Sequence, residues 1–387
     1  MEKIRKIPTA REMIEKLRRS EISLPPLSFR FLKGEPAMAG ENRRFDALVE
    51  TSWRANIAKF AVQCKSLSTP KAFQDGLNLL KSASLPKNYQ PLLFLPFLSE
   101  RQLQDLELEG ISGIDLCGNG VVVVPGMFAV FRSGEKNRFS SSAPIKNIYR
   151  KNSSMVGRVF LVRSGYETVQ EICAEINRRN MLVTLWNKRP MSLSTVSKSL
   201  KTLEEDLIVE RKGIIRLLQP EKLLEKLNEN YVPAVIKERV RLKVPEGSGT
   251  IQELLLKQSQ GLSVPLVAKG TSSVAQFAVM QRGDVLTVYC PRLEMLLERL
   301  RASQTDRFPN LELLETEDET VYFDARQQGD VWWASPVQVY LELMAGDKRD
   351  QETAEQVKSY ILKHLQTVQE RLRYSTSKHH CSTCFMK

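Results

Sequence analysis

The sequence predicts a multidomain α/β protein made of three parts. Its 387 residues are enough for two or three separate hydrophobic cores. In the first 150 residues, strand-like runs alternate with helix-like runs, whereas residues 167–205 have mainly helical periodicity. After a stretch rich in helix breakers, the remaining residues again mix both patterns. We therefore predict domains at residues 1–152, 153–231 and 251–372.

The first domain is expected to be an α/β domain with a central sheet. The run PLLFLPFL at residues 91–98 is apolar throughout, which is typical of a strand buried on both faces. Thr69 and Ser99 are typical N-caps, each directly before a predicted helix. The predicted helices are 9–19, 70–83 and 99–109, and the predicted strands are 44–52, 58–65, 91–98, 112–117 and 120–131, with a loop-rich lead-in from Pro25 to Gly40. Asp115 and Asn119 are interpreted as turn formers.

Three polar residues lie on the first two predicted strands of this domain. Asp46 is on one strand, and Gln63 and Lys65 share one face of the next, because alternate residues of a strand point the same way. An acid beside an E-x-K motif is the arrangement with which restriction-endonuclease-like enzymes hold Mg²⁺ and orient water. The order of helices and strands resembles that family too. The resemblance implies catalytic roles for Asp46, Gln63 and Lys65, with Asp46 and Gln63 as the metal ligands.

Gln63 is where the sequence departs from that family, which has a carboxylate at this position. A neutral amide removes one negative charge and should weaken Mg²⁺ binding. Glu50, or Glu12 and Glu15 on the first helix, could partly compensate for the lost charge. We expect a degenerate fold that holds DNA or has a structural role. An active Mg²⁺-dependent nuclease is the alternative.

The middle domain combines two predicted helices with a basic hairpin. In the second helix, residues 192–206, Val196, Leu200 and Leu203 form a buried stripe at helical spacing. The opposite face carries short hydroxyls and lysines, which suit phosphates and base edges. The predicted DNA-contacting residues are Ser194, Thr195, Ser197, Lys198 and Lys201, with Ser199 on the same face, and Arg211, Lys212 and Arg216 in the hairpin 207–218.

The segment STVSKSLKTLEEDLIVERKGIIRLLQPEKLL, which begins at Ser194, resembles the winged-helix regulators. In that family a helix of this kind ends in a hairpin, the wing, whose cations contact the DNA backbone. The resemblance implies a winged helix-turn-helix formed by residues 153–231, with a first helix at 168–177 and a closing helix at 220–230. A winged helix that is used for protein contacts alone is the competing interpretation.

The third domain follows a predicted linker at residues 232–250, which is rich in prolines and glycines. We expect strands at 283–290, 320–324 and 331–334, and helices from Pro336 and from about residue 350. A fragment that ends near Tyr231 is therefore expected to fold and bind DNA without residues 251–372.

The string SPVQVYLELMAGDKRDQETAEQV, which begins at Ser335, resembles the C-terminal part of abortive-infection E antitoxins, the AbiEi family. Glu342 replaces the usual aspartate, and Thr353 replaces an alanine. Together with the winged helix, the resemblance covers about residues 170–362. It implies an antitoxin that binds double-stranded DNA and has a nucleotidyltransferase-type toxin as partner. The matching residues are Ser335, Pro336, Gln338, Tyr340, Leu341, Glu342, Leu343, Arg349, Glu352, Ala354 and Glu355.

Composition agrees with a polyanionic partner and excludes several enzyme classes. The net charge is +12, and the stretch from Arg178 to Arg216 holds nine basic residues against four acidic ones. The three histidines all lie in the last 24 residues, which removes a Ser-His-Asp triad or an H-E-x-x-H zinc site from the rest of the chain. The tail His379, His380, Cys381 and Cys384 lacks the two-part spacing of a structural zinc site.

We therefore expect a DNA-binding transcriptional regulator of antitoxin type that requires no cofactor. The scattered cysteines and the lack of a signal peptide or membrane span predict a cytoplasmic protein. Two alternatives from other classes remain: a nuclease that uses Mg²⁺ and is targeted by the winged helix, and an adaptor that mainly binds protein.

Overall fold

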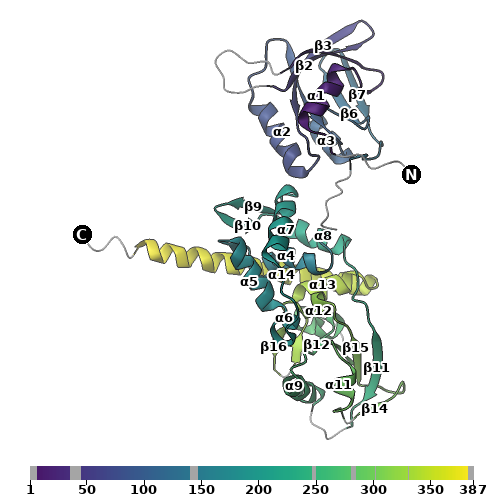
Figure 1. Ribbon diagram of the computed structural model, residues 1–387, viewed down its shortest axis with the longest axis vertical. Helices are drawn as coiled ribbons and strands as arrows, with labels where there is room; N and C mark the ends of the chain where they lie inside the picture. Colours follow the sequence, from purple (N-terminus) through teal and green to yellow (C-terminus); the bar gives the residue numbers. More distant parts are fainter. Residues whose placement is uncertain are drawn as a thin grey trace, which may run out of the picture. The chain divides into compact units, whose positions relative to one another are not determined.

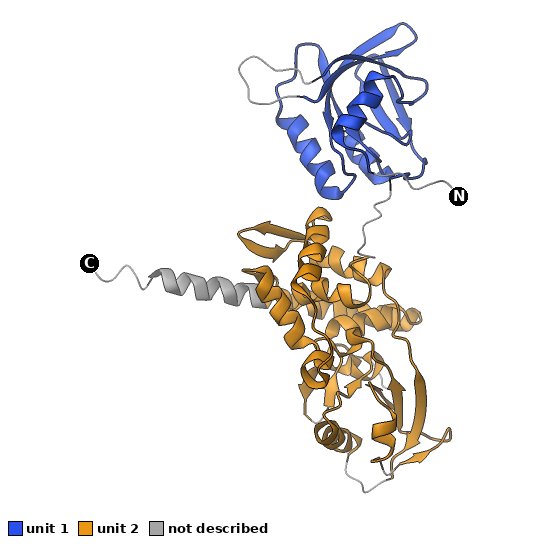
Figure 2. Ribbon diagram, in the orientation of Figure 1, with its two compact units in different colours: residues 1–144 blue, residues 145–387 orange. Residues whose placement is uncertain are grey.

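The computed structural model describes residues 7–34, 45–139, 147–245, 250–279, 285–300, 302–329 and 331–381. Its contacts divide the chain into two compact units, Met1–Pro144 and Ile145–Lys387 (Figure 2). Both units mix helices and sheets, which confirms the predicted α/β class. None of the helices in the described ranges combines the length and the apolar character that a membrane span needs.

The first unit is a seven-stranded sheet whose strands follow one another in chain order (Figure 1). β3, β4 and β5 are parallel, and the outer pairs are antiparallel. Helix α1 packs on one face of the sheet, and α2 and α3 pack on the other. The elements are α1 (Ala10–Arg18), β1 (Ser28–Gly34), β2 (Ala47–Trp53), β3 (Asn56–Cys64), α2 (Pro70–Ser82), β4 (Tyr89–Leu95), α3 (Glu100–Leu108), β5 (Ser112–Asp115), β6 (Gly120–Val124) and β7 (Phe128–Arg132).

Two predictions for this unit were wrong. The lead-in contains strand β1, because Phe29 packs into the core while Arg30 binds Glu50 of β2 across the pair. The single strand predicted at 120–131 is a hairpin of β6 and β7, whose turn uses the positive φ of 75° at Gly126. The other predicted elements of the first unit are confirmed within a few residues.

The second unit begins with a group of helices and a small sheet. Thr168, Asn180 and Ser192 cap the starts of α5, α6 and α7 through their side chains. The three strands of the small sheet lie in the order β8-β10-β9. The elements are η1 (Lys151–Ser154), α4 (Met155–Arg158), η2 (Val159–Leu161), β8 (Gly165–Tyr166), α5 (Val169–Arg179), α6 (Met181–Trp186), α7 (Leu193–Glu205), β9 (Val209–Lys212), β10 (Ile214–Leu217) and α8 (Pro220–Glu229).

A second seven-stranded sheet follows, in the order β14-β11-β15-β13-β12-β17-β16. β13 is parallel to β15 and β12 to β17, while the other neighbours are antiparallel. The elements are β11 (Glu238–Lys243), α9 (Ile251–Leu262), β12 (Val267–Ala268), α10 (Gly270–Ser273), η3 (Val274–Gln276), β13 (Leu286–Cys290), α11 (Glu294–Leu297), β14 (Ser303–Gln304), β15 (Leu311–Glu315), α12 (Glu319–Tyr322), β16 (Arg326–Gln328), β17 (Val331–Trp333), α13 (Pro336–Met344) and α14 (Lys348–Cys381).

The structure corrects two elements of this region. Residues 238–243, expected within a linker, form β11, because Val240 and Leu242 alternate with charged residues and face the core. Residues 246–249 of that segment lie outside the described residues. The strand predicted at 320–324 is instead the short helix α12, which starts where the Asp318 side chain accepts the Thr320 backbone N–H.

One hydrophobic core joins residues 147–231, here called the helical group, to residues 238–381, here called the C-terminal part. It runs from Ile148 to Leu365 and includes residues of α5, α7, α12, α13 and α14. Buried Arg158 of α4 donates from Nη1 to Gln338 Oε1 of α13 at 2.8 Å, and Gln338 Nε2 donates to Glu342 Oε1 at 2.8 Å. Burial lowers the pKa of Arg158 to about 10 and raises the pKa of Glu342. Residues 153–231 and 251–372 therefore pack as one body.

Candidate nucleic-acid interface

Helix α7 presents a polar face away from the core. Ser192 caps the helix by accepting the Thr195 N–H at 3.3 Å, and its Oγ lies 2.9 Å from Thr195 Oγ1. Val196, Leu200 and Leu203 are buried against the neighbouring helices, which confirms the predicted buried stripe. This packing leaves the opposite face of α7 open to solvent.

The side chains predicted to contact DNA divide into two groups. Ser194, Ser197, Lys198 and Lys201 are exposed on α7, and Thr195 is half-buried. Ser199, which was expected on the same face, is fully buried, and its Oγ has no hydrogen-bond partner within the described part of the chain. The prediction for Ser199 was therefore wrong, because it lies three residues after Val196 and shares the buried stripe.

The hairpin β9–β10 carries the remaining predicted cations. Arg211, Lys212 and Arg216 are exposed, and Gly213 turns the chain with a φ of 75°. Lys212 Nζ lies 2.9 Å from Glu210 Oε1, and the hydrogen bond to Lys212 lowers the pKa of the Glu210 carboxyl. Arg211 lies 3.9 Å from Glu204 of α7. The hairpin cations are thus positioned by acidic neighbours.

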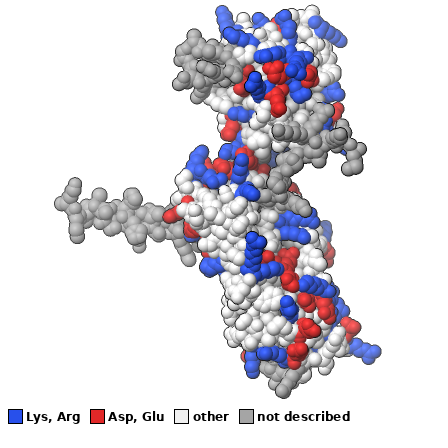
Figure 3. Space-filling model, in the orientation of Figure 1, with Lys and Arg blue, Asp and Glu red and all other residues white. Residues whose placement is uncertain are grey.

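The balance of charge on α7 and the hairpin is positive. The five cations Lys198, Lys201, Arg211, Lys212 and Arg216 stand against three acids, Glu204, Glu205 and Glu210. Figure 3 shows basic and acidic side chains intermixed where the hairpin lies. Exposed ion pairs contribute little stability, so Arg211 and Lys212 can exchange their glutamates for phosphates at small cost.

Two apolar side chains at the edge of this surface were missed from sequence. Leu193 starts α7 and is 43% exposed, and Ile214 follows the hairpin tip and is 48% exposed. Only the burial of their neighbours shows that these two residues face outward.

Two of the three polar residues predicted in the first unit, Asp46 and Gln63, are in contact. Asp46 Oδ2 accepts hydrogen bonds from Gln63 Nε2 at 2.7 Å and from the Cys64 backbone N–H at 2.6 Å. Lys65 follows directly, half-buried, and its backbone N–H binds Phe94 O at 3.0 Å. The thiol of Cys64 points to the opposite face, where burial, together with the negative charge of Asp46, raises its pKa.

The carboxylates that were expected to compensate for Gln63 bind elsewhere. Glu50 binds Arg30, Glu12 completes the cap of α1 with Thr9, and Glu15 pairs with Arg18. Within the described ranges, no three His, Cys, Asp or Glu side chains are grouped so that they could hold a metal. The side chains of His379, His380, Cys381 and Cys384 lie outside the description.

The residues present do not fit a Mg²⁺ ion. Asp46 supplies the group's single carboxylate, and two N–H donors already hold one of its oxygens. The Gln63 amide directs its nitrogen at that carboxylate. A hard divalent cation needs several oxygen ligands with negative charge, which this group lacks.

Asp115 and Asn119 form a turn, as predicted. The buried Asp115 carboxylate accepts the backbone N–H groups of Leu98, Cys117, Gly118 and Asn119, all within 2.9 Å. Burial raises the pKa of Asp115, and the Asn119 side-chain hydrogen bond opposes that shift. These contacts account for the acceptor capacity of Asp115 and indicate a structural role.

Comparison with known proteins gives one match. Residues 216–363 match the family model of a transcriptional regulator, the AbiEi antitoxin of type IV toxin–antitoxin systems. No curated protein and no solved structure matches the chain. The match starts in β10 and ends in α14, so α5 and α7 precede it, and it includes the motif that begins at Ser335. Over residues 216–363, the chain is thus similar to AbiEi antitoxins, as the sequence motif predicted.

Proposed function

We propose that the protein is a DNA-binding transcriptional regulator of antitoxin type that reads duplex DNA with a winged helix formed by residues 153–231. The observation that carries the proposal is the open face of α7, with Ser197, Lys198 and Lys201, beside the basic hairpin. A helix of 13 residues with short hydroxyls and lysines suits the major groove, and the hairpin cations suit the adjacent backbone.

The similarity over residues 216–363 supports the antitoxin part of the proposal. An antitoxin implies a toxin as partner, and we propose a toxin of the nucleotidyltransferase type. Double-stranded DNA is the second proposed partner. Neither contact with DNA phosphates nor binding of a protein needs a cofactor, so none is proposed.

The test is the salt dependence of duplex binding by Lys198→Ala/Lys201→Ala. Each lost phosphate contact reduces the slope of log K against log salt by about 0.9, so we expect a reduction of about 1.8. The matched control is Lys257→Ala/Lys363→Ala, which removes two exposed lysines from α9 and α14 and the same net charge. The control should keep the wild-type slope.

An equal loss in both double variants would show that net charge alone drives the binding. A slope that stays unchanged in a folded Lys198→Ala/Lys201→Ala protein would exclude α7 from the interface. Either result would overturn the proposed DNA-reading role of this helix.

For the first unit, we propose a restriction-endonuclease-like fold that does not cleave DNA. The supporting observation is that Gln63 donates a hydrogen bond to the Asp46 carboxylate instead of offering a second carboxylate. The site therefore has too few oxygen ligands for Mg²⁺. We expect the wild-type protein to leave plasmid DNA intact with Mg²⁺ or Mn²⁺, and Gln63→Glu to be the variant that gains metal binding. Robust cleavage by the wild type that Lys65→Ala abolishes would instead establish the nuclease alternative.

A further inference from the structure

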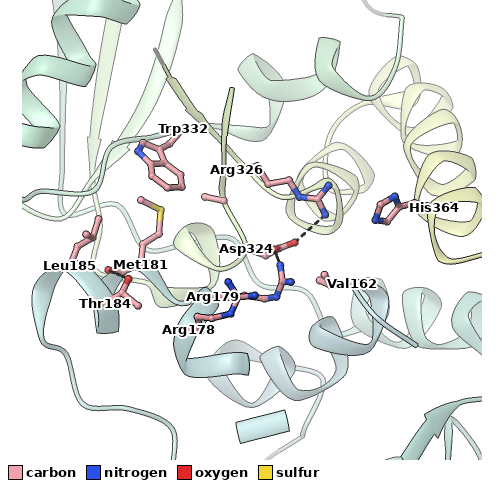
Figure 4. Close-up of a pocket in the computed structure, with 11 residues that line it drawn as sticks. Val162, Arg178, Arg179, Met181, Thr184, Leu185, Asp324, Arg326, Trp332 and His364 are labelled. Atoms are coloured by element: carbon pink, nitrogen blue, oxygen red, sulfur yellow. Dashed lines mark hydrogen bonds and ion pairs between the residues drawn. The ribbon is translucent and has the colours of Figure 1, made fainter. Parts of the chain in front are cut away.

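A pocket of about 510 Å³ lies within the second unit, between its helical group and its C-terminal part (Figure 4). Its volume is in the range of small-molecule sites. Arg178 and Arg179 come from the end of α5, Arg326 from β16, and His364 from α14. Residues far apart in the chain thus line one cavity.

The charged wall of the pocket is a chain of alternating ion pairs. Arg178 donates to both oxygens of Glu175 at 2.8 Å, and Arg179 Nε donates to Glu175 Oε1 at 2.7 Å. Arg179 also binds Asp324, which Arg326 Nη2 approaches at 3.4 Å. Three guanidinium groups therefore share two carboxylates, which leaves one positive charge uncompensated within this chain of contacts.

Two of these guanidinium groups have donors to spare. Arg326 makes one long contact, to Asp324, among the described side chains, although a guanidinium has five N–H donors. The Arg178 side chain is 65% exposed and uses two of its five N–H donors on Glu175, so three donors remain for a ligand. Planar guanidinium groups with spare donors match the paired oxygens of a phosphate or a carboxylate.

The opposite wall of the pocket is apolar. Met181 and Leu185 of α6 and the half-buried Trp332 of β17 line it. Figure 4 shows these three side chains on the side away from His364, with the arginines between. An indole ring offers a flat surface on which another ring can stack.

We propose that this pocket binds a small organic anion with a phosphate or carboxylate at one end and a flat apolar group at the other. The acidic end binds Arg178 and Arg326, and the flat group packs against Trp332 and Leu185. The ligand contacts α5 and α6 on one side and β16 and β17 on the other, so it bridges the helical group and the C-terminal part.

Calorimetric titration of the full chain tests the proposal with three probes. Adenosine 5′-monophosphate represents a phosphate source, 1-naphthoate represents a carboxylate source, and inorganic phosphate lacks the flat group. We expect one organic probe or both to bind at a single site with a Kd below ~1 mM. Inorganic phosphate should bind at least about tenfold more weakly, because it gains nothing from the apolar wall.

Three variants locate the site. Arg326→Gln and Arg178→Gln each remove charge-assisted hydrogen bonds and should weaken binding about tenfold or more. Trp332→Leu keeps an apolar side chain without the ring and should weaken binding about three- to tenfold. The matched control, Arg307→Gln, removes an exposed arginine outside the pocket and should leave affinity unchanged. Which organic probe responds to the variants identifies the ligand's acidic group.

The absence of millimolar binding by either organic probe would overturn the proposal. So would inorganic phosphate binding as tightly as the organic probes, or affinity that neither arginine variant changes. If Trp332→Leu fails to fold, Arg178→Gln still tests the site, because it changes an exposed side chain and should leave the fold intact. Because no arm of the experiment contains DNA, its result is independent of the proposed winged-helix function.

Discussion

Glu175 holds Arg178 and Arg179 at the end of α5 and is itself 19% exposed. The hydrogen bond from Arg178, together with that from Arg179, lowers the pKa of its carboxyl to about 2. A carboxyl whose pKa is lower in the folded than in the unfolded chain stabilises the fold when it is ionised. Its contribution is complete above the ordinary pKa of a glutamate and disappears as the pH falls toward 2.

Glu175→Gln should therefore destabilise the protein at pH 7 by on the order of 1–2 kcal/mol, after allowance for solvent around Arg178. The difference in free energy of unfolding from the wild type should shrink steadily as the pH is lowered from about 5 to 3. Urea denaturation at several pH values measures it. A difference that stays constant with pH would mean that the carboxylate charge contributes nothing.

Individual site residues could be predicted where a simple periodicity governs them. The contact between Asp46 and Gln63 follows from the antiparallel pairing of β2 and β3, which the two short strand patterns already indicated. Ser199 was misplaced because its hydroxyl suggested a polar face, although its spacing from Val196 and Leu203 places it on the buried one. At Ser199, spacing is the better guide and residue type misled the prediction.

At the level of elements, the hairpin β9–β10 carries one acid, Glu210, among its cations. Glu210 lies 2.9 Å from Lys212. In the proposed complex, its negative charge would face the DNA backbone beside the cations. Glu210→Gln should therefore raise the affinity for duplex DNA a few-fold at low salt, and the gain should shrink as salt screens the charges.

The measurement is a binding isotherm at 50 and 200 mM salt, roughly the range over which phosphate contacts weaken strongly. Glu229→Gln is the control, because Glu229 is an exposed acid on α8 that pairs with Lys226. An equal gain in both variants would indicate an effect of net charge. Weaker binding by Glu210→Gln would mean that Glu210 positions the hairpin rather than repels DNA.

The strongest sequence patterns predicted elements well, and weak or short ones did not. Helices α2, α3, α5, α7 and α13 had clear caps or apolar stripes and were found. β11 was hidden because charged residues fill its exposed face, and α12 because its apolar run is equally typical of a strand. In both cases the deciding factor is a partner distant in sequence, β15 for β11 and α6 for α12.

For the whole molecule, the shared core of the second unit changes what truncation should do. α8 packs against α13, and α12 packs against α6. A chain ending near Tyr231 would expose these faces to solvent. We therefore no longer expect such a fragment to fold and bind DNA, as its sequence had suggested. We expect residues 147–231 alone to lack cooperative unfolding, and residues 147–387 to unfold cooperatively without the first unit.

Circular dichroism and thermal denaturation of the two fragments check this. A sharp transition in the short fragment would show that the helical group is stable by itself. A failure of residues 147–387 to fold would show that the first unit supports the second. Composition suggested three domains because the prolines and glycines of residues 232–250 resemble a linker. The hydrophobic core that includes residues on both sides of this segment depends on long-range contacts, which no local sequence pattern reveals.

The buried contact between Arg158 and Gln338 also constrains the order of events during protein synthesis. The two residues are 180 positions apart in the chain. At about 5–20 residues per second, a ribosome needs roughly 10–40 s to add that length. The first unit is complete and can fold during this interval, whereas α4 must keep its arginine hydrated until α13 has been made. We expect the nascent second unit to be a chaperone client during this interval, and the proposed DNA-reading surface of α7 to reach its final fold only near the end of translation.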